Sequence, residues 1–211
     1  MEAVFTNTIF SISVLIISII IHEVAHGYAA FMLGDVTAKL SGRLTMNPLK
    51  HIDPVGSVLL PGLMILTQSN ILFGWAKPVP YNPHNLRSKR WGEAIVAAAG
   101  GVTNIFIALL FATIAQVSFA NGFQSYGELS LVVSFINLFL GMFNLLPLPP
   151  LDGYTVLRGV LPLSLNHSLR RFEDHIAHMG IFGLVLFLFV FSLFFSIPFF
   201  AFVRYIFSLI T

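Results

Sequence analysis

The chain has 211 residues, of which 56% are hydrophobic and only 9% are charged, and its net charge is +2. Soluble globular chains carry about 25% charged residues, so the composition excludes a soluble enzyme, a nucleic-acid-binding protein and a disordered chain. It indicates an integral membrane protein in contact with lipids. Cysteine is absent, so any transition metal must be bound through nitrogen and oxygen atoms.

Five apolar stretches are candidates for the bilayer, since a membrane-crossing helix needs about 20 apolar residues. The second stretch is interrupted by Pro54 and Pro61. The last stretch contains Pro198 and Arg204, and could hold one span with an interfacial segment or two short crossings. The stretches are residues 9–33, 52–73, 91–120, 129–146 and 180–210.

Lysine and arginine predict the orientation of these stretches. Basic residues lie in the loops on both sides of 52–73 and, as Arg158, Arg170 and Arg171, after 129–146, whereas the loop 121–128 has none. The positive-inside rule places the basic loops in the cytoplasm, so 52–73 should enter the membrane and return, or lie at its surface. The N-terminus is then outside, and the other four stretches cross alternately inward and outward.

The predicted fold is an all-α polytopic membrane protein. We expect a bundle of about four to six transmembrane helices with a short re-entrant or β-hairpin segment, formed by a single domain over residues 1–211. Residues 37–46 alternate weakly between apolar and polar, as a strand or hairpin would. Residues 163–178 are predicted to form an interfacial helix. Trp75 and Trp91 are predicted to lie as anchors at the membrane interface.

The strongest local motif is His22-Glu23-Val24-Ala25-His26. Two histidines at positions i and i+4 share one face of a helix, so both imidazoles can bind one Zn²⁺ while Glu23 lies beside the water at the metal. The motif directly follows an apolar run, where ionisable side chains are costly and usually functional. The alternative is an ordinary helix end at the cytoplasmic surface.

A catalytic zinc ion needs a third protein ligand. Asp152 is the favoured candidate, because its carboxylate follows an almost entirely apolar segment where an unpaired charge would be strongly penalised. Its alternative is a turn residue of an Asp-Gly pair. Asp35 and Asp53 fit helix caps or turns, and Glu93 fits a helix start, where an acid favours the helix dipole.

Together these motifs resemble the site-2 protease family of intramembrane zinc metalloproteases. The family pattern pairs H-E-x-x-H with a later N-x-x-P and L-D-G, matched here by Asn144, Pro147 and residues 151–153. The glycine-rich segment 100–104 is also similar, although family members often have Gly-Pro where this chain has Gly-Val. The resemblance implies the compact subgroup, without an inserted PDZ or CBS domain.

The expected function is therefore hydrolysis of peptide bonds within or near transmembrane segments of membrane proteins. One Zn²⁺ per chain on His22, His26 and Asp152 would activate water, and Glu23 would act as general base. Asn144 and Asn104 are candidate amide donors to the substrate, with buried hydrogen bonding between helices as the alternative.

The substrate would be a transmembrane protein or peptide that is unwound, because helical amides are already hydrogen-bonded. Residues 38–46 could pair with it as a strand, or form a plain loop. The expected location is a prokaryotic inner membrane with the active site towards the cytoplasm. A zinc-binding transporter and a catalytically silent scaffold are the rival functions. The pair His175 and His178 fits a solvated helix face better than a second metal site.

Overall fold

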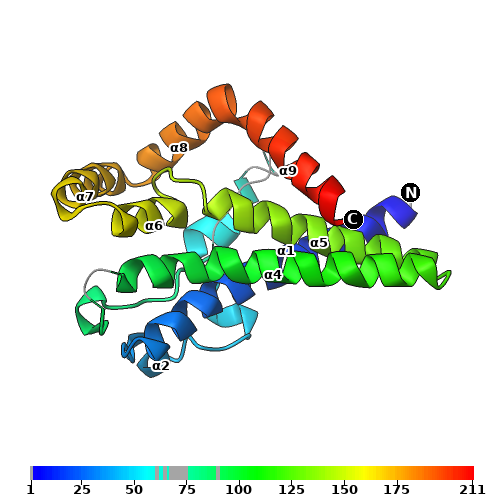
Figure 1. The fold of residues 1–211 in the computed structure, drawn as a ribbon, viewed down its shortest axis with the longest axis horizontal. Helices are drawn as coiled ribbons and strands as arrows, with labels where there is room; N and C mark the ends of the chain where they lie inside the picture. Colours follow the sequence, from blue (N-terminus) through cyan, green and yellow to red (C-terminus); the bar gives the residue numbers. More distant parts are fainter. Residues whose placement is uncertain (1, 60–61, 64–65, 67–75, 89–90) are drawn as a thin grey trace.

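The computed structural model describes residues 2–59, 62–63, 66, 76–88 and 91–211, and within these ranges every assigned element is helical. The long helices are α1, α4 and α5, and two helices and a π-helical turn form a bent C-terminal arm (Figure 1). The elements are α1 (Glu2–Met32), α2 (Thr37–Leu40), η1 (Pro48–Lys50), η2 (Pro54–Leu59), η3 (Pro83–Asn85), α4 (Gly92–Ala120), α5 (Gln124–Asn144), α6 (Asp152–Val160), α7 (Leu163–His178), α8 (Ile181–Val190), η4 (Phe191–Phe195) and α9 (Ser196–Ile210).

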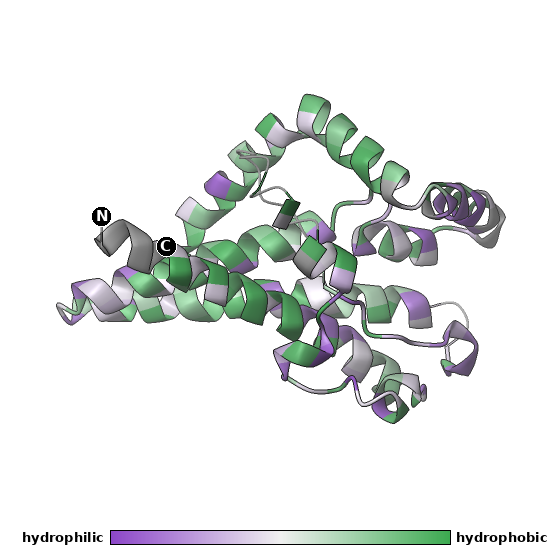
Figure 2. Cartoon of the chain, turned by 180° about the vertical axis from the view of Figure 1, so that it is seen from behind, coloured by the Kyte–Doolittle hydropathy of each residue, from purple (hydrophilic) through white to green (hydrophobic). Residues whose placement is uncertain are grey.

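Four helical segments of the described residues are long and apolar enough to cross a membrane. They correspond to four of the five predicted stretches and confirm a polytopic, all-α membrane protein. Figure 2 shows hydrophobic residues along the long helices and the arm, and hydrophilic residues concentrated on α7 and on loops at the same end. The segments are Thr8–Met32, Gly92–Ala120, Gln124–Asn144 and Phe182–Ile210.

Helices α4 and α5 form an antiparallel hairpin that packs against α1 (Figure 1). Small residues allow the close approach: a Cβ atom added to Gly141 would lie 2.7 Å from the carbonyl oxygen of Gly101. The turn between the two helices contains Gly122 with φ of 79°, a backbone conformation that favours glycine. Without a hydrophobic driving force between helices in lipid, such close packing is a main source of helix association.

The C-terminal arm packs against α5 through aromatic rings. Phe143 on α5 contacts Phe191 and Phe199 of the arm, with ring centroids 5.2 Å and 5.9 Å apart. The arm bends sharply where the π-helical turn η4 joins α8 to α9 (Figure 1), and a π-helical turn is a recognised cause of such a bend. The stretch 180–210 thus contains one long, bent candidate span, most of which is exposed on the surface of the chain.

The two ends of the molecule carry different elements of the fold. The N-terminus, the turn between α4 and α5, and the C-terminus lie at one end, whereas α7, α2 and the loop with η3 lie at the other (Figure 1). Four crossings with both termini on one side are therefore consistent with the predicted alternation of spans.

The weak alternation of residues 37–46 gave a wrong prediction. The segment begins with the helix α2, and turns or irregular backbone follow it, so no strand is present there. Helix α2 is only one turn long, and the amphipathic spacing of so short a segment does not distinguish a helix from a strand. The pairing of residues 38–46 with an extended substrate stays a prediction.

Two other predictions concern the stretch 52–73 with Trp75, and the segment 163–178. Trp75 and much of the stretch 52–73, for which a re-entry or a surface position was predicted, lie outside the described residues. The described part of the stretch includes η2, six residues of π-helix. The helix predicted for residues 163–178 is observed as α7, with the same boundaries, and its place at the membrane interface stays a prediction.

Candidate metal and catalytic site

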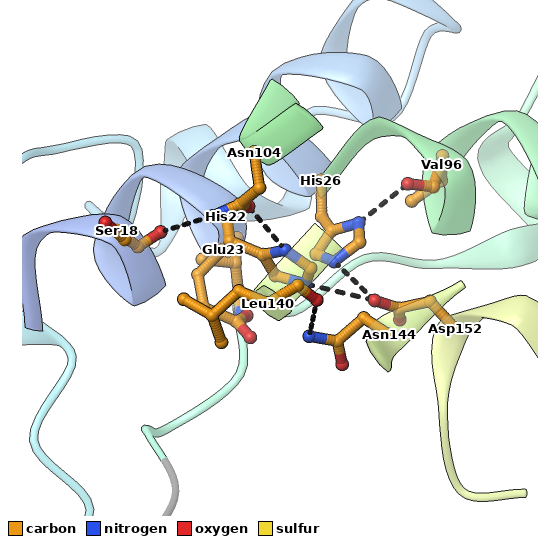
Figure 3. A network of polar contacts seen from close by, with 10 residues as sticks. Ser18, His22, Glu23, His26, Val96, Asn104, Leu140, Asn144 and Asp152 are labelled. Atoms are coloured by element: carbon orange, nitrogen blue, oxygen red, sulfur yellow. Dashed lines mark hydrogen bonds and ion pairs between the residues drawn. The ribbon is translucent and has the colours of Figure 1, made fainter. Parts of the chain in front are cut away.

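The two histidines of the motif lie on one face of α1, as their spacing predicts. Both side chains are buried, and their rings meet edge to face with centroids 4.6 Å apart. Their Nε2 atoms point towards the same place, where the first residue of α6 approaches α1 (Figure 3).

That residue is Asp152. Its Oδ2 atom lies 3.0 Å from Nε2 of His22 and 3.3 Å from Nε2 of His26. A Cβ atom on Gly153 would lie 2.2 Å from the carbonyl oxygen of Leu145, so only glycine lets α6 begin this close to the end of α5. The Leu-Asp-Gly sequence therefore delivers the carboxylate to the histidines.

This group of side chains fits a zinc ion. Ligand atoms 2.0–2.1 Å from a tetrahedral zinc lie about 3.3 Å from one another, close to the distances just given. The ligand atoms of His22, His26 and Asp152 all lie within 4.8 Å of one another. Burial acts to raise the pKa of Asp152, but the two histidines, when Nε2 carries a proton, outweigh burial and hold that pKa at about 2. A zinc ion bound at this place would replace those Nε2 protons and would favour the ionised carboxylate in the same way.

Residues of helix α4 orient the two imidazoles towards the candidate zinc position. Nδ1 of His26 donates to the carbonyl oxygen of Val96 over 2.7 Å, and Nδ1 of His22 donates to Oδ1 of Asn104 over 2.9 Å. A proton on Nδ1 leaves Nε2 of each imidazole able to bind a metal ion. A Cβ atom on Gly100 would lie 2.6–2.7 Å from the Nε2 atoms of both histidines, so the absence of a side chain there leaves the space that the rings occupy.

Glu23 is held differently from its neighbours. Its carboxylate is half-buried, and Oε2 accepts a hydrogen bond of 3.0 Å from the backbone N–H of Val79. We call residues 76–82 the strap, because this irregular segment runs alongside the helix that carries Glu23. The side chain of Val79 is buried, and a Cβ atom on Gly27 would lie 2.7 Å from it.

The strap is fixed on both sides of Val79. The guanidinium group of Arg43 donates to the carbonyl oxygens of Lys50, Lys77 and Pro78, the last two over 3.0 Å and 3.2 Å. At the far end, the N–H of Asn82 donates to Oδ2 of Asp35 over 2.7 Å. A buried arginine thus holds the strap through backbone acceptors.

Helix α6 is fixed in place by a group of ion pairs around the buried side chain of Arg158. Arg158 contacts Glu93, at the start of α4, over 2.5 Å and Glu173 on α7 over 3.3 Å, and Arg170 adds a second contact to Glu93. A Cβ atom on Gly159 would lie 2.5 Å from that of Ala94. These contacts tie α6, and hence its first residue, to α4.

The two predicted substrate-binding asparagines lie in different surroundings. Asn104 is fully buried, and its side chain contacts His22, Asn137 and the backbone of Ser18. Asn144 is half-buried at the last turn of α5, where its Nδ2 donates to the carbonyl oxygen of Leu140 (Figure 3).

The remaining acidic candidates serve local structure. Asp35 accepts hydrogen bonds from the backbone and side chain of Thr37, and Asp53 accepts from the backbone N–H groups that follow it. Glu93 forms the ion pairs of α6. His175 and His178 are exposed on α7, and in the described part of the chain the group at His22 is the one that could hold a metal ion.

Comparison with known proteins identifies the family. A model of peptidase family M50 matches residues 124–190, which include Asn144 and Asp152. The chain is 37% identical over 168 residues to YwhC of Bacillus subtilis, a candidate zinc metalloprotease, and the alignment covers 76% of this chain and 73% of that protein. The chain belongs to peptidase family M50.

Two further relatives of this M50 peptidase are candidate zinc metalloproteases called Rip2. The chain is 30% identical over 156 residues to the protein of Mycolicibacterium smegmatis, covering 74% of this chain and 57% of that protein. It is 28% identical over 173 residues to the protein of Mycobacterium tuberculosis, covering 82% and 64%. No solved structure matches the chain. The predicted identity, an intramembrane zinc metalloprotease of the site-2 type, is confirmed.

Three features of this M50 site were not predicted from the sequence: the contacts of Val79, of Arg43 and of Asn137. The N–H of Val79 and the guanidinium group of Arg43 carry no local signal, because a backbone contact from a distant loop depends on tertiary structure. Asn137 could have been found as a polar residue within an apolar stretch. Gly100 was noticed in the glycine-rich segment, but its role depends on the neighbouring histidines.

Proposed function

We propose that this M50 peptidase cleaves transmembrane protein substrates with one Zn²⁺ held by His22, His26 and Asp152. The observation that carries this proposal is the convergence of two Nε2 atoms and one carboxylate oxygen from α1 and α6, beside the carboxylate of Glu23. When bound, Zn²⁺ supplies a Lewis acid that favours deprotonation of water and polarises the scissile carbonyl group.

Glu23 is the general base in this proposal. Its Oε2 is hydrogen-bonded to the N–H of Val79, so Oε1 takes the proton from the attacking water and later passes it to the nitrogen of the leaving amine. The three metal ligands do not include Glu23, so its replacement removes proton transfer and leaves metal binding intact.

Asn144 binds the substrate backbone in this proposal. It ends α5 seven residues before the Leu-Asp-Gly segment, on the same side of the site as Asp152 (Figure 3). An amide side chain can donate to a carbonyl oxygen of an extended substrate and accept from its N–H. The substrate segment must be unwound to offer these groups, because a helix in lipid has already paired them.

The proposed location is a prokaryotic inner membrane, with the metal site towards the cytoplasm. The end of the molecule that carries α7, α2 and the η3 loop contains the basic loops, and the positive-inside rule places such loops in the cytoplasm. Because the chain has no cysteine, single-cysteine variants report this orientation directly. Phe123→Cys should react with a membrane-impermeant maleimide on intact cells, and Arg171→Cys only after permeabilisation. The reverse pattern would mean the opposite orientation.

The activity is tested with single-pass membrane peptides in detergent, comparing the purified protein with its Glu23→Gln variant and measuring zinc per chain on both. We expect the variant to lose cleavage and keep one zinc. Equal cleavage by both samples would reject Glu23 as the base, and loss of zinc from the variant would reject the ligand assignment. If the protein were instead a zinc-binding transporter, its transport rate would be unchanged in Glu23→Gln.

A further inference from the structure

A buried chain of hydrogen bonds runs from α5 through α4 to the metal site on α1. Asn137 on α5 contacts Asn104 on α4, and Asn104 contacts His22. The exposed fractions of Asn137, Asn104 and His22 are 1%, 0% and 6%. Polar side chains at such depth in a membrane protein are costly unless they are paired, and they are usually functional.

Backbone carbonyl groups fix the direction of this chain of hydrogen bonds, because a carbonyl oxygen can only accept. The carbonyl oxygen of Val133 accepts from Nδ2 of Asn137 over 2.9 Å, which turns Oδ1 of Asn137 towards α4. That oxygen accepts from Nδ2 of Asn104 over 3.0 Å, and the carbonyl oxygen of Ser18 lies 3.5 Å from the same Nδ2. The opposite orientation of either amide would place oxygen against oxygen.

The orientation of Asn104 determines which nitrogen of His22 carries the proton. With its Nδ2 directed at Asn137, Asn104 presents Oδ1 to Nδ1 of His22, which must therefore carry the proton. The lone pair of His22 is then on Nε2, the atom that faces Asp152. His26 needs no such relay, because its Nδ1 donates directly to the carbonyl oxygen of Val96.

We propose that Asn137 is a positioning residue of the metal site, which acts on His22 through Asn104. This inference rests on the proposed assignment of His22 as a metal ligand. Asn137 contacts neither the metal ligands nor Glu23 in the described structure, yet its Oδ1 decides which way Asn104 faces. Hydrogen-bond partners behind a metal ligand typically change metal affinity by 10–100-fold.

The same pair of helices offers a matched control. Ser134 lies one helical turn before Asn137, is fully buried, and donates from Oγ to the carbonyl oxygen of Ala108 on α4 over 2.8 Å. Ser134→Ala therefore removes a buried hydrogen bond between α5 and α4 that has no link to His22. A purely structural role for Asn137 would make the two positions equivalent.

The test measures Co²⁺ affinity by chelator competition on the full-length protein in detergent, with the visible absorption of bound Co²⁺ as a second readout. We expect Asn137→Leu to weaken binding about 10–100-fold and to alter the spectrum, while Ser134→Ala leaves both unchanged. In Asn137→Asp, burial favours the neutral carboxyl group, whose O–H can donate to the carbonyl oxygen of Val133 while its other oxygen accepts from Nδ2 of Asn104, so this variant should restore most of the affinity. Thermal unfolding of each variant checks that it is folded.

The outcomes separate this inference from the proposed function. If His22→Ala and Asp152→Asn abolish Co²⁺ binding but Asn137→Leu behaves like Ser134→Ala, the relay is rejected and the metal site stands. If neither ligand substitution affects Co²⁺ binding, the ligand assignment and the relay are both rejected. If Asn137→Leu and Asn137→Asp bind Co²⁺ equally weakly, the oxygen that accepts from Asn104 does not determine the metal affinity, and the relay is again rejected.

Discussion

His22 and Glu23 are neighbours in the chain, but the structure holds them in different ways. The imidazole of His22 is buried between long helices and is hydrogen-bonded to another helix. The carboxylate of Glu23 is half-buried and is hydrogen-bonded to the strap, a loop segment that Arg43 fixes from the side. The proposed metal ligands thus depend on helix packing, and the proposed base depends on a loop.

This difference matches the tasks of the two groups. A metal site needs fixed ligand positions, because its affinity depends on ligand geometry and on the groups behind the ligands. A general base must reach a proton on water and then one on the leaving group, so it benefits from a less enclosed position. Substitutions behind the histidines should therefore change zinc content, and substitutions in the strap should change turnover.

The largest effect is expected from Gly100→Ala. The added methyl group would overlap the Nε2 atoms of His22 and His26, and two long helices cannot separate without loss of packing. Zinc content measured by atomic absorption should fall to background, and cleavage with it. Val102→Ala, at an exposed position of the same helix, should retain one zinc. A zinc-loaded Gly100→Ala protein would contradict the observed contact between α4 and the histidines.

An intermediate effect is expected from Arg43→Gln. The loss of charged hydrogen bonds to the strap, each worth about 1.5–3 kcal/mol, loosens the N–H that holds Glu23. We expect kcat to fall about tenfold while zinc content is unchanged. Arg43→Lys should not restore turnover, because lysine lacks the planar fork. Arg171→Gln, on the exposed surface of α7, serves as the control. Loss of zinc from Arg43→Gln would show that the two regions are not separate.

The smallest effect is expected at the far end of the strap. Burial acts to raise the pKa of Asp35, but hydrogen bonds from Thr37, Asn85 and Asn82 outweigh burial and lower that pKa below its usual value of 3.8. The ionised form therefore stabilises the fold above pH 3.8, and this contribution is lost as the pH falls through the lowered pKa.

Thermal unfolding of Asp35→Asn tests this assignment. We expect the variant to unfold several degrees below the parent protein at pH 7, with the difference narrowing as the pH falls below 3.8. Metal content should be unchanged. A difference that is the same at every pH would show that the charge of Asp35 does not stabilise the strap.

Much of the fold and the candidate metal-binding residues could be predicted from the sequence, because the spans and the histidine pair follow patterns with a clear period or spacing. Hydropathy located the four candidate spans, and the i, i+4 spacing placed His22 and His26 on one face. Asp152 was found because a carboxylate is costly after an apolar segment. The one-turn helix α2 was mistaken for a strand, because so few residues do not define a period.

The supporting contacts could not be predicted in the same way. The hydrogen bond from Val79 to Glu23 joins residues 56 positions apart, and that from His22 to Asn104 joins residues 82 apart. Such pairs depend on how helices and loops pack, and a backbone N–H leaves no mark in the sequence. Asn104 illustrates the limit: both alternatives considered for it were chemically reasonable, and its observed partners favour hydrogen bonding between helices.

In the proposed site His22, His26 and Asp152 bind the metal, and Glu23 does not. X-ray absorption at the zinc edge, on the parent protein and on Glu23→Gln, tests this assignment. The assignment predicts a shell of nitrogen and oxygen atoms with two imidazole ligands, the same in both samples, at distances of about 2.0–2.2 Å. A zinc shell that loses a ligand in Glu23→Gln, or that contains fewer than two imidazoles in the parent protein, would contradict it.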